Sequence, residues 1–415
     1  MKVAASMLLA SIPRVSASSS SCFVLSSVVS FRRSSSSIWL RNDGLRRQRH
    51  GQSYFATSSS SDEEKTEERV INVSRLSTLQ TLLTMRGAPG SIGCSMGNGD
   101  LVPVSHSSST SSSEYHNLHP HLLPLAKSKS SGHVVCALRR WYADESETFD
   151  TPSLLARPWP IVESAVGMPG MRLLSLNSEH LMRRIAADAD VNNGGDNVVE
   201  IYNDGLGNGR LSEKSMDEPY VQGSVTKLGY GLDKYILLRV GPFPDLYETM
   251  SNIHLSKNDI KSSLIAAEAS NGKFGGRFGS TFVFYAKLLA SQQREEESRD
   301  AARMTLRMSL STMGLTRKDY VDVARMTGYA TTDDDGDVAL TKMLEMYEKI
   351  RNHENKDEKP DDKTLQQKAI EDVDYILDKA CLMGQKYGEI RREVASIYRD
   401  AGLEEDARFI EDRSM

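Results

Sequence analysis

Apolar residues are distributed unevenly along the chain. Serine dominates the first third, as in residues 105–113, and Val70–Met85 has leucines at helical spacing but no neighbouring segment to cover them. A segment this polar buries too little apolar surface to offset its conformational entropy, so we expect residues 61–130 to be disordered. Tryptophan, proline and aliphatic residues first occur together near His133, where we expect the folded part to begin.

Short apolar runs predict two or three β-strands in the next part of the chain. Val198–Tyr202 is followed by a turn sequence, and Tyr235–Val240 is ended by glycine and proline. Runs of β-branched and aromatic residues between turn residues are typical of strands. Ahead of them, Ser178 is a suitable N-cap for a helix that reaches about Ala189.

The apolar spacing becomes helical after residue 255. Ser256–Asp259 resembles a capping box, and Thr316–Asp319 is a second helix start. Apolar residues at helical spacing predict a long helix from about Thr281 to Met308 and another over Val338–Arg351.

The last part of the chain predicts a helical hairpin. After a charged linker, an apolar stripe begins at Leu365 and stops at Gly384, and a second stripe from Ile390 stops at Gly402. Glycine directly after a helix is a common stop signal, and a short connection favours antiparallel helices.

Charge is as unevenly distributed as hydrophobicity. The formal net charge is −5, yet residues 1–60 hold eight Lys and Arg against Asp43 alone, a charge of +7, which leaves −12 for the remainder. A cationic, serine-rich and acid-poor leader is typical of a transit peptide. Val3–Leu9 is too short for a secretory signal, and no run approaches the roughly 20 apolar residues that span a bilayer.

The leader does not by itself identify the organelle. Arg46–Arg49 followed by Ser53–Thr57 is typical of a mitochondrial cleavage site, whereas the serine richness is typical of a plastid leader. The four cysteines, Cys22, Cys94, Cys136 and Cys381, form no CxxC pair, which fits a reducing compartment without a disulfide framework.

Together these patterns predict an α+β fold that is predominantly α-helical. A small strand-containing N-terminal part is followed by a helical region that ends in a helical hairpin. The predicted organisation is a transit peptide over 1–60, a disordered Ser-rich segment over 61–130, a small α+β region over 131–255, a helical region over 256–352 and a C-terminal helical hairpin over 363–415.

Sequence motifs favour a protein that is not an enzyme. Neither a nucleophile elbow, a zincin helix, a phosphate-binding loop nor a kinase signature occurs, so we assign no catalytic, cofactor or metal residues. The acidic run Asp333–Asp337 fails as a calcium loop because Lys342 stands where a glutamate ligand is required. His116, His119 and His121 have metal-like spacing, but we expect a floppy segment there without a fourth ligand.

Two segments carry candidate partner-binding residues. The glycine-rich stretch 272–279 contains Lys273, Phe274, Arg277 and Phe278, a composition that binds phosphate or stacks on bases. A plain loop between two helices is the favoured alternative, because the acidic body offers no wider basic surface. Trp159 lies between prolines, where it serves equally well as an interface anchor or as a plug at the edge of a core.

Two longer stretches carry a family resemblance. Leu154–Ile185 and Ala269–Met304, with the helical tail after them, resemble a land-plant family of nuclear-encoded chloroplast proteins that assist chloroplast ATP synthase biogenesis. The likeness covers about residues 130–415. It implies a cofactor-free assembly factor or chaperone in the chloroplast stroma, with soluble ATP synthase subunits as protein partners.

Other functional classes stay open at this point. An organelle RNA-binding factor would use Lys273–Phe278 as its contact, an enzyme of unrecognised type would need a pocket with convergent polar groups, and a mitochondrial location is the alternative to the plastid. DNA is not an expected partner, and peripheral membrane association is compatible with the sequence.

Overall fold

The computed structural model describes residues 75–94, 99–105, 114–140, 159–192, 196–206, 219–314, 316–354 and 363–412. Contacts divide the chain into Met1–Ala56 and Thr57–Met415, and every described residue belongs to the second unit. The predicted transit peptide over 1–60 lies outside the described residues.

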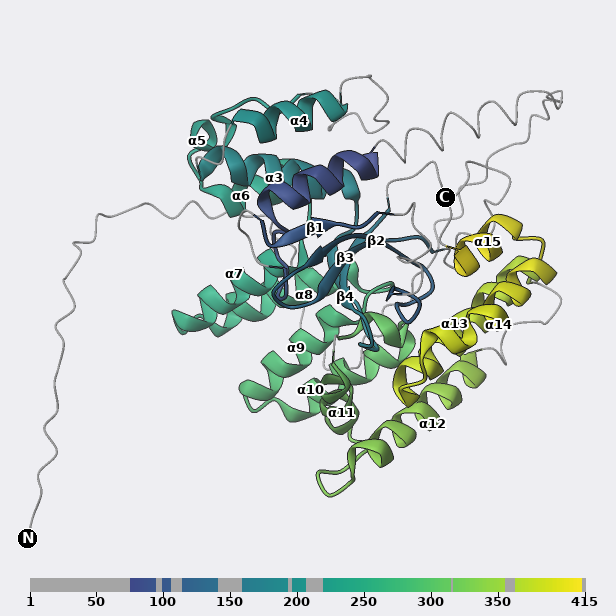
Figure 1. Ribbon diagram of the computed structural model, residues 1–415. Helices are drawn as coiled ribbons and strands as arrows, with labels where there is room; N and C mark the ends of the chain where they lie inside the picture. Colours follow the sequence, from purple (N-terminus) through teal and green to yellow (C-terminus); the bar gives the residue numbers. More distant parts are fainter. Residues whose placement is uncertain are drawn as a thin grey trace, which may run out of the picture. The chain divides into compact units, whose positions relative to one another are not determined.

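A five-stranded antiparallel sheet lies among the helices (Figure 1). Its order, β1-β2-β3-β4-β5, follows the chain, so each strand pairs with the strand before it. The strands are β1 (Leu101–Pro103), β2 (Leu122–Ser128), β3 (His133–Leu138), β4 (Ile161–Ala165) and β5 (Arg172–Ser175).

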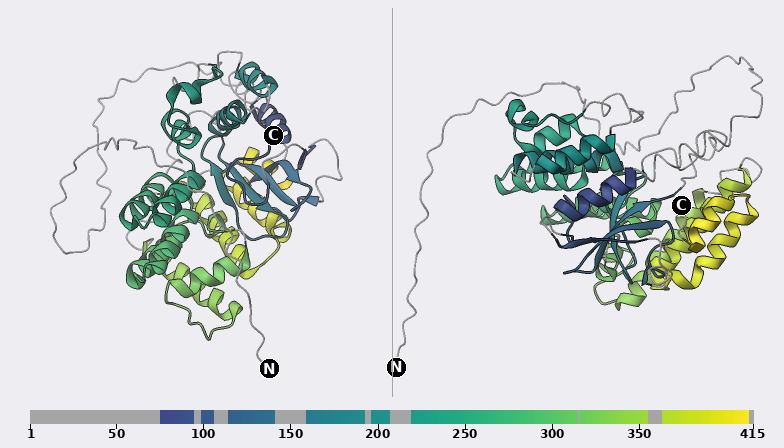
Figure 2. Two further views of the ribbon diagram at one scale, coloured as in Figure 1. Left: turned by 90° about the vertical axis from the view of Figure 1, so that its left-hand side faces the viewer. Right: turned by 45° about the horizontal axis from the view of Figure 1, so that its top comes forward.

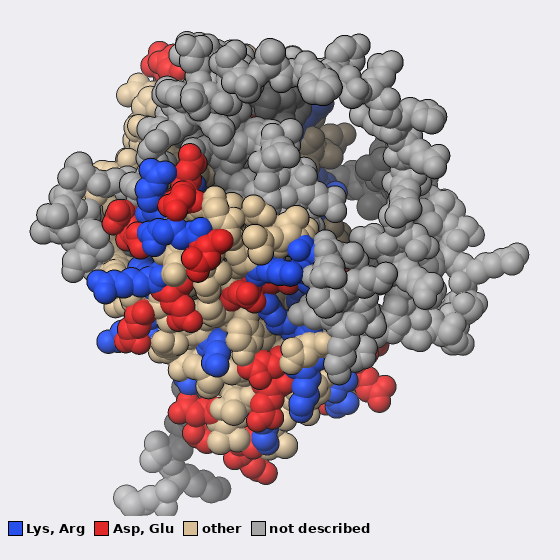
Figure 3. Space-filling model, turned by 90° about the vertical axis from the view of Figure 1, so that its right-hand side faces the viewer, with Lys and Arg blue, Asp and Glu red and all other residues tan. Residues whose placement is uncertain are grey.

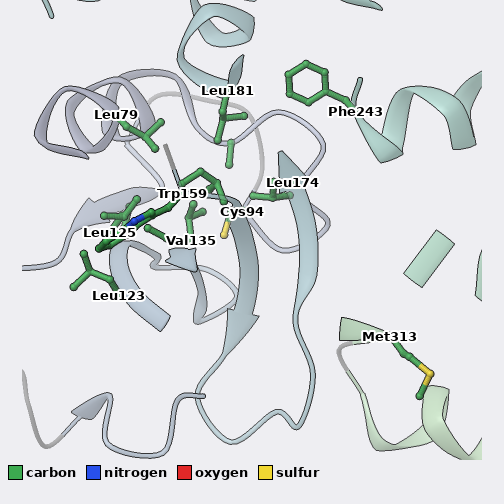
Figure 4. Close-up of a cluster of buried hydrophobic side chains, with 14 of the residues drawn as sticks. Leu79, Cys94, Leu123, Leu125, Val135, Trp159, Leu174, Leu181, Phe243 and Met313 are labelled. Atoms are coloured by element: carbon green, nitrogen blue, oxygen red, sulfur yellow. The ribbon is translucent and has the colours of Figure 1, made fainter. Parts of the chain in front are cut away.

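Both faces of the sheet are buried. Alternate residues of a strand point to opposite faces, so Val135 packs into one apolar cluster and Val134 into another. The first cluster includes Leu79 and Leu181 from helices on that side (Figure 4), and the second includes Phe278. A sheet covered on both faces has few alternating polar positions, so its strands carry no alternation of polar and apolar residues that would distinguish them from other short apolar runs.

The expectation of disorder over 61–130 is wrong for the described part of that segment. Residues 75–86 form a helix, and its leucines are buried against the sheet, with Leu79, Leu82 and Leu83 at 0% exposure. Figure 2 shows this first helix alongside the strands. The sheet that covers these leucines is formed by residues that follow the helix in the sequence, which is why the sequence alone did not predict their burial.

Helices make up most of the described structure. After the sheet come α3 (Ser178–Val191), α4 (Asp196–Leu206), α5 (Ser224–Leu228), α6 (Leu232–Arg239), α7 (Pro244–Ser256), α8 (Ile260–Phe274), α9 (Ser280–Ser291), α10 (Glu295–Met304), α11 (Arg317–Met326), α12 (Gly336–Glu354), α13 (Leu365–Met383), α14 (Tyr387–Asp400) and α15 (Glu404–Asp412), with short 3-10 turns η2 (Thr305–Arg307) and η3 (Leu310–Thr312).

The two segments predicted as strands are helices. Val198–Tyr202 lies in α4, and Tyr235–Val240 runs through the end of α6. In each case the apolar residues form one buried side of a short helix, such as Tyr235 and Ile236 on α6. Runs this short have the same composition whether they belong to a buried strand or a buried helix face.

Helix starts were predicted more accurately than helix lengths. Asn177 rather than Ser178 caps α3, and Thr316 caps α11 as predicted. Asp259 rather than Ser256 caps α8, because Ser256 is the last residue of α7. Each of the three caps accepts a backbone N–H from the first turn of its helix. The long helix predicted over Thr281–Met308 is wrong, because α9 and α10 are separated by a turn in which Gln293 has a φ of 60°.

The C-terminal helical hairpin is confirmed. Thr364 opens α13 with a capping box, and Gly384 ends it in the left-handed conformation with a φ of 69°. Helix α14 follows, and α15 extends the hairpin by an element that was not predicted. The α+β, mostly helical fold class is therefore confirmed, while the domain boundaries stay a prediction. None of the described helices is long and apolar enough to span a bilayer.

We expect Gly170→Ala to destabilise the fold. An added Cβ at Gly170 would lie 1.4 Å from the backbone oxygen of Gly314, so the β4–β5 turn would have to separate from the segment after η3. Such overpacking costs about 1–3 kcal/mol, measurable as a lower midpoint in urea denaturation. Gly272→Ala is the matched control, because nothing lies within 4 Å of its added Cβ and its midpoint should not fall.

Candidate functional site

The aromatic residues of the 272–279 stretch belong to the core. Phe274 and Phe278 are 2% and 0% exposed and pack with Val134 and Cys136 on the second face of the sheet. The ring of Tyr247 meets that of Phe274 edge-on at 6.1 Å. Neither phenylalanine is available for stacking on a base in this structure, which removes the main feature that suggested RNA binding.

Trp159 is also a core residue. It is 2% exposed, lies two residues before the start of β4, and belongs to the same apolar cluster as Val135. Its ring centroid is 6.4 Å from that of Phe409 on α15, in an edge-on arrangement. This position corresponds to the core-plug alternative, in which the indole holds a C-terminal helix against the sheet.

Lys273 and Arg277 are the two predicted partner-binding residues that reach the surface. Ile265 lies in the middle of α8, is 55% exposed, and follows Lys261 by four residues. Lys273 lies two turns further along the helix, near its end. The end of α8 therefore presents Lys273 and Arg277, whereas the phenylalanines beneath anchor it to the sheet.

The C-terminal helices are fixed to the segment before β2 by a buried arginine. Arg391 on α14 is 2% exposed and donates to the carbonyl oxygens of His116 at 2.9 Å and Leu118 at 3.0 Å. A third bond from the same guanidinium goes to the carbonyl of Ile410 on α15. One side chain thus joins the two C-terminal helices to a segment more than 250 residues earlier in the sequence.

All three histidines noted for their spacing lie in this interface, His116 through its carbonyl oxygen. The His121 Nε2 is 2.8 Å from the Tyr398 hydroxyl, and the His119 ring meets the Tyr387 ring at 5.0 Å. Burial, with nearby arginines, holds the pKa of His121 well below its usual value. The expectation that these histidines belong to a floppy segment is wrong.

Ion pairs complete this interface at the end of β3. Arg139 pairs with Asp406 at 3.1 Å and Arg140 with Asp374 at 2.6 Å. Asp378 is 1% exposed and accepts hydrogen bonds from the Ser309 hydroxyl, the Ser311 backbone N–H and the Tyr347 hydroxyl. Burial raises the pKa of the Asp374 and Asp378 carboxyls, an effect that Arg140 partly offsets.

The β4–β5 turn is held by the same helices. The Pro169 carbonyl accepts hydrogen bonds from the Cys381 thiol and the Tyr387 hydroxyl, each at 2.9 Å. Burial raises the pKa of Cys381 to about 12, and that of Cys94 to the same value. Both thiols are therefore neutral at physiological pH, and a neutral thiol is a poor nucleophile.

The acidic run at Asp333–Asp337 closes on a lysine. The Lys342 ammonium donates to both carboxylate oxygens of Asp334 at 2.8 Å, and the Thr331 backbone N–H donates at 2.6 Å. These bonds, led by that of Lys342, lower the pKa of Asp334 to about 2. Lys342, the residue that argues against a calcium site, thus pairs with one acid of this loop, Asp334. Across the described residues, no cluster of three or more potential ligands is placed to hold a metal.

Charges of both signs alternate on the face that Figure 3 shows. Lysine and arginine side chains lie beside aspartate and glutamate on its coloured part, without a broad patch of one sign. Nucleic-acid surfaces are usually broad and positively charged, so this face gives no support to an RNA interface.

One exposed surface was missed by the sequence analysis. Val221, Tyr230 and Leu238 are 69%, 63% and 63% exposed, and they lie on or beside α5 and α6. The sequence predicts a buried strand over Tyr235–Val240, and a buried strand leaves no exposed position for Leu238. Helical spacing from Lys234 to Leu238 was the signal that could have revealed it.

Comparisons with known proteins agree with the family resemblance. Residues 244–330 match the PAB middle domain and residues 343–413 the PAB C-terminal domain. The chain is 28% identical, over 294 residues, to the Arabidopsis thaliana protein named "Protein IN CHLOROPLAST ATPASE BIOGENESIS, chloroplastic". That similarity covers 70% of this chain and 78% of the Arabidopsis protein. The predicted resemblance is thereby confirmed.

The buried Asp378 makes a pH-dependent contribution to stability. Its pKa is raised in the folded state, so the folded protein holds this proton more tightly than the unfolded chain does. The contribution is complete below its ordinary pKa of 3.8 and is lost as the pH rises through the folded-state value. Relative to Asp378→Asn, the wild type should therefore lose stability as the pH rises.

Urea denaturation of both proteins from about pH 3.5 upward to about pH 8 measures this difference. Asp322→Asn serves as the control, since that carboxyl is not fully buried and lies on α11 outside the C-terminal interface. A stability gap between wild type and Asp378→Asn that widened in favour of the wild type at higher pH would contradict the assignment.

Proposed function

We propose that this protein is a non-catalytic assembly factor of the chloroplast stroma that binds soluble subunits of the chloroplast ATP synthase before they are assembled. The similarity to the Arabidopsis biogenesis protein is the observation that carries the proposal, because it extends over 78% of that protein rather than one short motif. The cationic, serine-rich leader supports import into an organelle.

The packing of the described residues supports a binding role. The buried groups that could be reactive in another setting take part in packing. They fix the C-terminal helices to the sheet or to η3, and they are Asp374, Asp378, Cys381 and His121. An assembly factor has to cover apolar surface on a partner and then release it. Small apolar contacts with a charged rim suit such reversible binding.

The end of α8 is the proposed contact within the PAB middle domain match. Lys273 and Arg277 would meet acidic groups of the partner, while Ile265 supplies apolar contact. Trp159, Phe274 and Phe278 would contribute indirectly, by holding this helix and the C-terminal helices in place.

Affinity capture tests the proposal. We expect the tagged mature chain, crosslinked in chloroplast stroma, to recover soluble ATP synthase subunits. The double variant Lys273→Glu/Arg277→Glu should recover about tenfold less, because two attractive charge contacts become repulsive. The double variant Lys349→Glu/Lys368→Glu makes the same change in net charge at exposed positions of α12 and α13, and it should recover as much as the wild type.

Two results would count against this account in different ways. Recovery of no ATP synthase subunit by the wild type would overturn the proposed function. Equal losses in both double variants would retain the function but remove Lys273 and Arg277 from the contact.

A further inference from the structure

A second exposed surface lies on α5 and α6, outside both PAB domain matches. Tyr230 stands between Gly229 and Gly231, whose φ angles are 75° and 84°. Glycine takes such angles freely, whereas other residues are strained there. The two glycines let the chain turn sharply on both sides of Tyr230, and the side chain stays 63% exposed at the corner.

The exposed side of α6 continues from this corner. The Lys234 ammonium lies 5.8 Å from the centroid of the Tyr230 ring, within the range of a cation–π contact. Leu238 follows Lys234 by four residues, so both lie on the same side of the helix, and Leu238 is 63% exposed. The opposite side of α6 carries Tyr235 and Ile236, which are buried in the core. The exposed stripe is therefore held by a firmly packed helix.

Charge on this surface is opposite to that of the protein body. Lys227 on α5 and Lys234 on α6 are exposed cations of these two helices, and Asp233 is an exposed acid beside Lys234. The body of the chain beyond residue 60 carries a formal charge of −12. A local cationic surface on an acidic protein attracts acidic groups of a partner and repels basic ones.

We propose that this surface, formed by Tyr230, Lys234 and Leu238 with Lys227, binds an acidic amphipathic helix of a partner protein. Apolar side chains of that helix cover Tyr230 and Leu238, and its carboxylates face the two lysines. The inference rests on the proposed function, since it names the chemistry of a partner segment that an assembly factor holds.

A protein segment fits this surface better than a membrane does. Asp233 stands next to Lys234 in the first turn of α6. An anionic bilayer presents negative charge over its whole surface and would repel this carboxylate. A helix can leave that position open or place a polar side chain there. The same amphipathic arrangement is used widely when helices are bound on apolar surfaces.

Fluorescence anisotropy with a synthetic peptide tests the inference. The probe is a labelled helical peptide of about four turns, with leucine on one side and glutamate elsewhere. We expect the wild-type chain to bind it in a salt-dependent manner, and Lys234→Glu or Leu238→Glu to weaken binding by about tenfold or more. Lys349→Glu and Leu365→Glu are matched controls, because both are exposed positions on other helices, and they should bind as the wild type does.

Charge exchange makes the test specific. A second peptide with lysine in place of glutamate should bind the wild type poorly and regain affinity for the Lys234→Glu variant. Equal binding of the acidic peptide to the wild type and to Lys234→Glu would overturn the proposal. So would stronger binding of the wild type to anionic phospholipid vesicles than to the peptide, because the surface would then be a membrane contact.

The outcome is separable from that of the proposed function. If Lys234→Glu and Leu238→Glu still capture ATP synthase subunits as well as the wild type does, the α6 surface is not the partner contact, although the assembly role stands. If the wild type captures no ATP synthase subunit but binds the acidic peptide, the α6 surface is supported and its partner is another protein. Unchanged thermal midpoints would show that the variants are folded.

Discussion

The buried guanidinium of Arg391 is the interaction on which the arrangement of the C-terminal helices depends. Removing a charged group from water is costly unless its N–H groups find acceptors, and here three backbone carbonyls supply them. Those carbonyls belong to the segment before β2 and to α15. The geometry of the bonds therefore specifies a single position for the hairpin relative to the sheet, and Arg139 and Arg140 reinforce it through their pairs with Asp406 and Asp374.

This constraint determines where binding surfaces remain. With the C-terminal helices over one part of the sheet and α8 over another, the reactive-looking side chains are used in packing. Two of the exposed apolar side chains, Leu238 on α6 and Ile265 on α8, each lie four residues from a lysine, Lys234 and Lys261. Small contacts of this kind suit a protein that must release its partner, because affinity there depends on a few side chains and on charge.

Helix capping was a good signal in the sequence because it is local, although the cap expected at Ser256 is Asp259. Thr316, Thr364 and Gly384 end or begin helices within one residue of the predicted position. The sheet could not be predicted in the same way. Its strands are buried on both faces, and the helix that covers one face precedes them in a serine-rich region. The misassigned run at Tyr235 shows the opposite error, in which a short helix face has the composition of a strand.

The candidate site followed the same division between local and long-range information. Exposure of Lys273 and Arg277 agrees with their position at the end of a helix, whereas the burial of Phe274, Phe278 and Trp159 depends on the sheet and on α15.

Hydrogen exchange of Arg391→Met, measured by mass spectrometry, tests the role of the Arg391 guanidinium most directly. We predict faster exchange in residues 114–140 and in α15 together with α14. Faster exchange confined to α14 would contradict the account.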